Sequence, residues 1–183
     1  IPLMLDPYHY YSREEALRLA KGLEKLDFLW LEEPMDEHSE DSYIYLTANT
    51  SLNICGPETA EGKYYTRANW VRNNAADIGR AGALDCAGLT SVMKCVHMYE
   101  ANGMSVELHG NHIANLHALG AMGIDGKYFE RGLLHPMLDY EKPSPWFNSI
   151  YDKMDEDGNV LIPQSPGLGW DINWDYINDN KVK

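Results

Sequence analysis

Three carboxylic acids recur along the chain at equal spacing, each directly after a short apolar segment. Asp6 and Glu32 are 26 positions apart, and so are Glu32 and Glu58. If the apolar segments are neighbouring parallel strands about 4.8 Å apart, the three carboxylates converge at one edge of a sheet. Close carboxylates repel each other, and a divalent cation relieves that repulsion. An all-carboxylate set suits hard Mg²⁺, so we predict a magnesium site formed by Asp6, Glu32 and Glu58.

The elements that must position these acids follow an alternating pattern. Short apolar runs predict strands, and amphipathic stretches with helical spacing predict the helices between them. The segment from Ser12 to Glu15 is typical of a capping box and marks the start of the first helix. The predicted strands are 1–5, 28–31, 52–55, 76–78, 105–108 and 128–129, and the predicted helices are 12–26, 39–49, 66–73, 88–102 and 113–122.

The period of this pattern indicates the fold class. The residues that end the six predicted strands are Asp6, Glu32, Glu58, Gly82, His109 and Glu130, at intervals of 26, 26, 24, 27 and 21 positions. One strand, one loop and one helix occupy this length, which indicates parallel strands joined by right-handed crossovers. Six such units favour an α/β fold of the (β/α)₈ barrel type, in which the C-terminal ends of the strands carry the chemistry.

A complete barrel needs about 250 residues, whereas the six units here occupy about 130. We therefore expect residues 1–135 to be strands three to eight of a (β/α)₈ barrel that lacks its first two strands. Residues 136–183 are expected to form an extended, ordered C-terminal tail packing on the barrel, with a turn at 155–158. The chain opens with Ile1 on a strand already under way, which we interpret as a piece of a longer polypeptide.

Composition limits the partners of the chain. Fifteen basic and 28 acidic residues give a net charge of −13, which phosphate backbones and anionic lipid surfaces repel. No apolar run approaches the ~20 residues that span a bilayer. Cys55, Cys86 and Cys95 fit neither a disulfide framework nor a zinc motif. We therefore expect a cytoplasmic protein with neither nucleic acid nor membrane as a partner.

Several short motifs occur in a fixed order at the predicted strand ends. They are Leu5-Asp6, Trp30-Leu-Glu-Glu-Pro34, Gly56-Pro-Glu58, Ala87-Gly-Leu-Thr90 and Leu108-His109-Gly110, followed in the tail by Pro166-Gly-Leu-Gly-Trp170. Together they resemble the enolase superfamily, and within it the acid-sugar dehydratases of the mandelate racemase/muconate lactonizing branch. The resemblance implies a barrel preceded by an N-terminal capping domain, on which the tail of this chain would also pack.

The resemblance also implies roles for the matching residues. Asp6, Glu32 and Glu58 would be the Mg²⁺ ligands, with Glu33 as the alternative to Glu32. A proton α to a carboxylate is very weakly acidic, and Mg²⁺ bound to that carboxylate stabilises the enediolate that forms when the proton leaves. The superfamily combines such a metal with a Lys or His base.

By the same resemblance, His109 would be the catalytic histidine at the end of the seventh strand. Glu130 would be the eighth-strand acid that hydrogen-bonds the substrate carboxylate or its enediolate. Related sixth strands end in an Asp that pairs with this histidine, but the matching position here is Gly82. Asp85 is the first candidate to replace it, and we expect His109 to titrate in the physiological pH range.

The residues just after Asp6 are further candidates. Some relatives place a general-acid His two positions after this Asp, whereas here Tyr8 holds that position and His9 follows it. Either side chain would be able to protonate a departing hydroxyl group.

These observations predict a Mg²⁺-dependent lyase that dehydrates an aldonate or aldarate to a 2-keto-3-deoxy acid. The alternatives are a racemase, epimerase or cycloisomerase that uses the same metal, or an inactive barrel fragment that binds only metal or a partner chain. The partner is expected to be a small sugar acid, and the full-length form is expected to be a homo-oligomer. We expect residues 1–183 alone to lack activity, because the second-strand base and the lid would be missing.

Overall fold

A computed structural model describes residues 1–123, 128–131 and 142–182. The strands are β1 (Met4–Leu5), β2 (Trp30–Glu32), β3 (Asn53–Gly56), β4 (Ile78–Ala81) and β5 (Ser105–Leu108). The helices are α1 (Arg13–Glu24), α2 (Glu40–Asn49), α3 (Lys63–Asn73), α4 (Leu89–Ala101), α5 (Ile113–Ala121) and α6 (Trp174–Asp179). The strands form one parallel sheet in the order β1-β2-β3-β4-β5. The predicted α/β class with parallel pairing is therefore confirmed.

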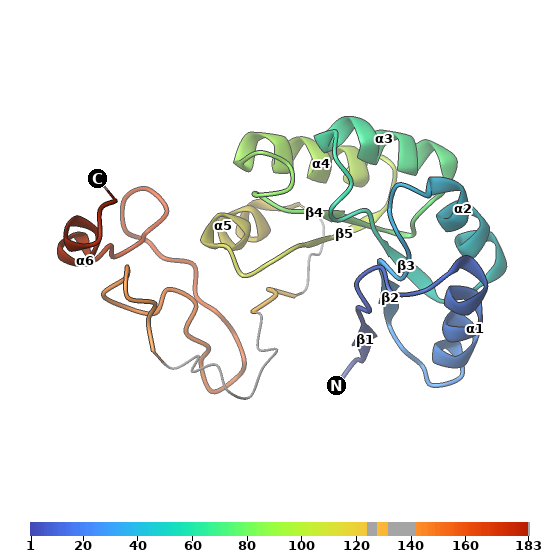
Figure 1. Cartoon of the computed structure of the whole chain (residues 1–183), viewed down its shortest axis with the longest axis horizontal. Coiled ribbons are helices and arrows are strands. Elements are labelled where there is room, and N and C mark those ends of the chain that lie inside the picture. The colour runs from blue at the N-terminus through green and yellow to red at the C-terminus, as the bar shows by residue number, and fades with distance from the viewer. Residues whose placement is uncertain (124–127, 132–141, 183) are drawn as a thin grey trace.

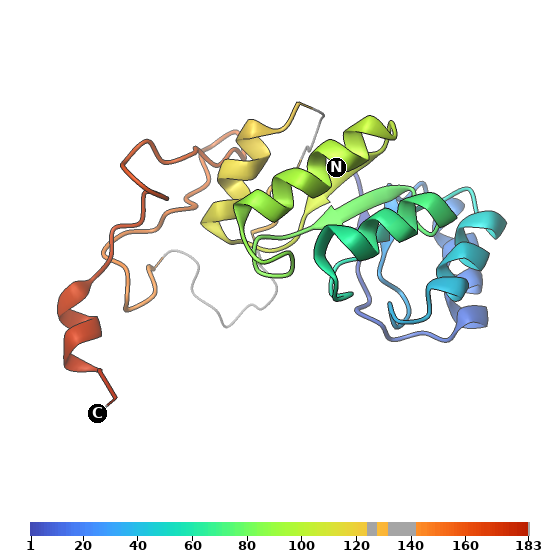
Figure 2. The same cartoon turned by 90° about the horizontal axis from the view of Figure 1, so that it is seen from above.

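Helices α1 to α4 follow one another along the outer side of this sheet (Figures 1 and 2). Each strand pairs with the strand nearest in sequence, as successive strand–helix units require. The predicted capping box forms at the start of α1, where the Ser12 backbone N–H donates to a Glu15 carboxylate oxygen at 3.0 Å.

Strand β4 corrects one predicted boundary. The pattern predicts a strand at 76–78, whereas the strand runs from Ile78 to Ala81 and all four of its residues are buried. Arg80 within it is the reason the pattern misleads, because a charge in a buried strand is unfavourable unless it is paired. Glu32 on β2 and Glu58 just after β3 pair with this guanidinium, so the strand continues through it.

The sixth predicted strand, at 128–129, is reduced to one parallel bridge between Leu108 and Phe129. This bridge places Glu130 beside the end of β5. Helix α3 begins at Lys63, three residues before the predicted start at Thr66.

The two sides of the sheet differ in character because successive strand residues face opposite ways. Side chains such as Leu31 and Ile54 pack with the helices in an apolar cluster. Trp30, Cys55 and Ile78 form a separate cluster, with Met4, Leu29 and Tyr128 packed against it. Two residues further along their strands, Glu32 and Arg80 share the side of Trp30 and Ile78. Polar groups therefore lie at the C-terminal strand ends, above this apolar layer.

The C-terminal segment 142–182 contains little regular structure. Antiparallel bridges join Phe147 to Ile172 and Met154 to Val160, and the second of these closes the predicted turn at 155–158. Helix α6 was not predicted. The predicted boundary between residues 135 and 136 lies outside the described residues, so the division into barrel and tail stays a prediction. Across the described segments, no helix is both long and apolar enough to span a bilayer.

Candidate active site

A single guanidinium joins the acids at the strand ends. Arg80 on β4 is 5% exposed, and its Nη2 lies 2.6 Å from Oε1 of Glu32 and 2.5 Å from Oε2 of Glu130. Its Nε lies 3.3 Å from Oε2 of Glu58. Burial lowers the pKa of Arg80, but the surrounding carboxylates outweigh burial and raise that pKa above its ordinary value. Strands β2, β3 and β4 and the segment after β5 therefore meet at one buried cation.

His109, just after β5, lies between two carboxylates. Its Nδ1 is 2.7 Å from Oδ2 of Asp85, and its Nε2 is 3.2 Å from Oε1 of Glu58. Burial lowers the pKa of His109, whereas Asp85 and Glu58 raise it, and the net shift is upward. Burial also opposes the charge of Asp85, but the hydrogen bond from the imidazole holds the pKa of Asp85 below its usual value. The predicted contact between His109 and Asp85 is confirmed.

Gly82 explains how a carboxylate three positions later reaches this histidine. A Cβ at position 82 would lie about 2.2 Å from Oδ2 of Asp85, so the aspartate carboxylate occupies the space that a side chain there would fill. The turn after β4 is closed by the Cys86 N–H, which donates to the Gly82 carbonyl at 2.8 Å. The absence of a side chain at Gly82 therefore leaves the space in which the Asp85 carboxylate reaches His109.

Glu130 is oriented by two donors on one oxygen. Its Oε2 accepts from Arg80 and from the backbone N–H of Gly110 at 3.0 Å. The side chain is 39% exposed, so Oε2 is held by its two donors while the rest of the carboxylate remains accessible. Glu130 is therefore anchored through Oε2 and still accessible to solvent.

The loop after β1 carries Asp6, Tyr8 and His9. Asp6 is exposed, its Oδ1 accepts from the Tyr8 N–H at 3.0 Å, and its charge contributes to raising the pKa of Glu32. Tyr8 and His9 have positive φ angles of 48° and 60°, a strained backbone that is common at functional sites. Their rings stack 4.8 Å apart, and Tyr8 is 64% exposed.

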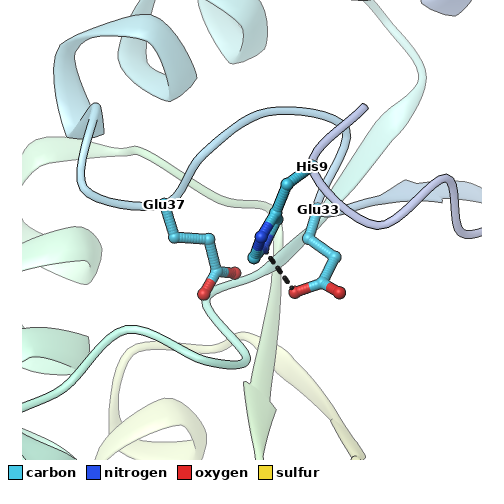
Figure 3. Close-up of side chains that lie close together, drawn as sticks. All are labelled: His9, Glu33 and Glu37. Carbon is cyan, nitrogen blue, oxygen red and sulfur yellow. Dashed lines mark hydrogen bonds and ion pairs between the residues drawn. The ribbon is translucent and has the colours of Figure 1, made fainter. Parts of the chain in front are cut away.

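His9 belongs to a second cluster. Its Nε2 lies 3.0 Å from Oε2 of Glu33, and Figure 3 shows the imidazole between the carboxylates of Glu33 and Glu37. Among the residues that the structure describes, this is the trio whose ligand atoms lie within 4.8 Å of one another. The predicted trio of Asp6, Glu32 and Glu58 is not gathered in that way: Arg80 contacts Glu32 and Glu58, whereas Asp6 is exposed and accepts from the Tyr8 N–H.

Glu37 already accepts four hydrogen bonds, three from backbone N–H groups and one from the Thr59 hydroxyl at 3.0 Å. Its Oε1 accepts from the N–H of Glu58 at 2.6 Å, and its Oε2 accepts from the N–H groups of Thr59 and Ala60 at 2.7 and 2.8 Å. A carboxylate held by three N–H groups is a poor metal ligand unless those bonds break. We therefore interpret Glu37 as a structural anchor of the loop after β3.

Arg67 on α3 holds the same loop through its carbonyl groups. It is fully buried, and its guanidinium donates to the backbone oxygens of Glu58, Ala60 and Lys63, at 2.6, 3.3 and 3.0 Å. A fourth bond, from its Nε, reaches the Arg80 carbonyl on β4 at 2.9 Å. The loop that carries Glu58 is therefore clamped by an anion on its N–H groups and by a cation on its carbonyl groups.

The acids of the site hold protons more tightly than ordinary carboxyls. Burial raises the pKa of Glu58 to about 9, against the lowering effect of His109 and Arg80. Burial and the neighbouring acids raise the pKa of Glu33 to about 9 as well, and burial raises the pKa of Glu32. Oε1 of Glu33 is buried without a hydrogen-bond partner among the described residues. An oxygen-rich, negatively crowded site of this kind fits a hard divalent cation.

The raised pKa of Glu33 predicts a pH effect on stability. Folded Glu33 keeps its proton up to about pH 9, whereas the unfolded residue loses it near pH 4.3. The contribution of this group is therefore complete at low pH and declines as pH rises through that window. In urea unfolding with EDTA at pH 5.5 and 8.5, Glu33→Gln should lose less stability over this interval than the wild type. Equal losses in the two proteins would contradict the assignment.

Three buried residues were missed by the sequence reasoning. Arg80 did leave a signal, since an Arg inside the apolar segment 78–81 of a strongly acidic chain must be paired. Arg67 and Glu37 left none, because they contact backbone groups that no residue spacing reveals.

Comparisons with known proteins match this chain along nearly its whole length. The family model described as "Enolase C-terminal domain-like" matches residues 1–176. The crystal structure of D-glucarate dehydratase from Agrobacterium tumefaciens complexed with magnesium has 47% sequence identity and a TM-score of 0.95. It covers 100% of this chain and 47% of that chain.

Two curated relatives are more distant. D-galactarolactone cycloisomerase of Agrobacterium fabrum is 27% identical over 98% of this chain, and arabinonate dehydratase of Saccharolobus solfataricus is 26% identical over 100%. The chain spans about half the length of these relatives, 49% and 48% respectively. The relatives are thus sugar-acid dehydratases and cycloisomerases, and solved neighbours contain magnesium. The extent of the family match establishes that the chain belongs to the enolase C-terminal domain-like family.

Proposed function

We propose that this protein is a Mg²⁺-dependent dehydratase of sugar acids. The observation that carries the proposal is His109, held by Asp85 on one ring nitrogen and directed at Glu58 with the other. A histidine oriented in this way beside an acid cluster is suited to proton transfer at Nε2. The family match and the magnesium complex of a 47% identical relative support the same reading.

In this proposal Asp6, Glu32 and Glu58 would hold Mg²⁺, with Glu33 as the alternative to Glu32. The donor set supports this assignment, because carboxylate oxygens are the preferred ligands of Mg²⁺ and their crowding calls for positive charge. When bound, the ion supplies positive charge beside a substrate carboxylate and so favours removal of the adjacent proton.

The protein's own groups then divide the proton transfers. Asp85 accepts from Nδ1 of His109, which leaves Nε2 to exchange a proton with the substrate. Glu130, fixed through Oε2 by Arg80 and Gly110, would direct its other oxygen to the substrate. His9 or Tyr8 would protonate the departing hydroxyl group from the opposite loop. Water is then lost, and the resulting enol becomes a 2-keto-3-deoxy acid.

We propose aldarates, which carry a carboxylate at each end, as the substrate class. The relative with 47% identity is named for D-glucarate, and this identity is well above that of the curated relatives at 26–27%. A cycloisomerase is the second candidate, because D-galactarolactone cycloisomerase is among those relatives.

Product mass distinguishes these candidates. The protein, expressed from its complete reading frame, should convert D-glucarate with Mg²⁺ into a keto acid lighter by one water, and EDTA should abolish the reaction. A cycloisomerase or racemase gives a product of unchanged mass. Failure to dehydrate any of a panel of aldarates and aldonates, with isomerisation of a lactone instead, would contradict the dehydratase proposal.

A further inference from the structure

The buried guanidinium of Arg80 has no role in the function proposed so far beyond its contact with Glu130. It contacts two of the proposed metal ligands, Glu32 on β2 at 2.6 Å and Glu58 just after β3 at 3.3 Å. The side chains of these three residues are 6%, 5% and 4% exposed, so water screens their charges poorly. Any cation bound by Glu32 and Glu58 would therefore meet a fixed positive charge beside it.

Removing positive charge from this place would leave several carboxylates unbalanced. Both Glu32 and Glu58 contact Arg80, and the charge of Asp6 acts on Glu32 while that of Glu33 acts on Glu58. The planar Arg side chain is suited to hold this arrangement, because it reaches Glu58 through Nε and reaches Glu32 and Glu130 through Nη2. A Lys ammonium keeps the charge but lacks this fork.

We propose that Arg80 is a positioning residue that acts as the internal counter-cation of the site. It holds Glu32, Glu58 and Glu130 in one frame when Mg²⁺ is absent, and it weakens the binding of Mg²⁺ by competing for the same carboxylates. This inference rests on the proposed function in one respect, that Glu32 and Glu58 hold Mg²⁺. Arg80 would thus lower the affinity of the site for Mg²⁺ and, at the same time, keep the ligand carboxylates in position before the ion binds.

The test compares Arg80→Met, Arg80→Lys and Arg67→Met in the protein expressed from its complete reading frame. Arg67 is the matched control, because it is equally buried but its hydrogen bonds go to backbone carbonyls. Two measurements do not depend on any substrate. They are the dissociation constant of Mg²⁺ by calorimetry and the shift in unfolding temperature between EDTA and saturating Mg²⁺.

Arg80→Met should bind Mg²⁺ about tenfold more tightly than the wild type, because one positive charge is lost from a poorly screened site. Its unfolding temperature should fall in EDTA and recover markedly with Mg²⁺. Turnover should nevertheless fall, because Glu130 loses one of its two anchors. Arg67→Met should also lose stability, but without that added recovery, since its loss leaves the charge among the carboxylates unchanged.

Arg80→Lys keeps the result decisive if Arg80→Met fails to fold. With the charge retained, its dissociation constant for Mg²⁺ should stay within about threefold of the wild-type value. A change beyond tenfold in Arg80→Lys, or unchanged or weaker Mg²⁺ binding in folded Arg80→Met, would overturn the proposal. Absence of Mg²⁺ binding in the wild type would instead refute the proposed metal site, and binding without dehydration would refute only the proposed reaction.

Discussion

Replacing His109 by Asn should lower turnover by ~10²–10⁴-fold while Mg²⁺ and substrate still bind. The amide keeps a polar group near Glu58 but cannot exchange a proton as the imidazole does. Steady-state kinetics give the loss in kcat, and calorimetry shows whether the dissociation constant of Mg²⁺ is retained. Unchanged kcat would remove His109 from the mechanism, and the proton exchange assigned to its Nε2 would belong to another group.

Asp85→Asn provides the companion measurement, because it alters His109 without removing it. Asp85 raises the pKa of His109, so the variant should shift the titration of His109 to lower pH. The limb of the pH–rate profile that reports this histidine should move in the same direction. A profile that stays in place would show that the 2.7 Å contact has no part in tuning His109.

Glu58→Gln should weaken Mg²⁺ binding by at least ~10²-fold, because it replaces a charged ligand by a neutral amide. The same change also removes the negative charge that Glu58 presents to Arg80 and to Nε2 of His109, so kcat should fall with it. Calorimetric titration of the variant with Mg²⁺ measures the effect directly.

The control for this variant is Glu61→Gln in the same loop. The side chain of Glu61 is 82% exposed and contacts His38, so its neutralisation should change Mg²⁺ binding by less than about twofold.

If Glu33→Gln abolishes binding while Glu58→Gln does not, the ion is held by the trio of His9, Glu33 and Glu37, and the predicted ligand set is wrong.

The fold was predictable because its signals are local. Apolar runs, a capping box at Ser12 and strand ends spaced like Asp6 and Glu32 each occur within a few residues or at a fixed period. The pairing of His109 with Asp85 was predictable for a similar reason, since the only question was which nearby acid replaced the residue missing at Gly82.

The rest depended on contacts between residues far apart in sequence. Arg80 and Glu130 are 50 positions apart and Glu58 and Arg80 are 22 apart, and no periodic pattern marks either pair. The strand carrying Arg80 was therefore predicted to end too early. The segment around α6 has too few apolar positions to give a helical period, so its single short helix was missed.

The clamp formed by Glu37 and Arg67 has a consequence for motion. Loops that connect strands to helices usually open often, and their amide protons exchange quickly with solvent. Here the N–H groups of Glu58, Thr59 and Ala60 are each held by a buried carboxylate, while Arg67 restrains the carbonyls of the same segment. Amide exchange in this loop should therefore be as slow as in the neighbouring strands, so the segment that carries Glu58 behaves as an extension of the sheet.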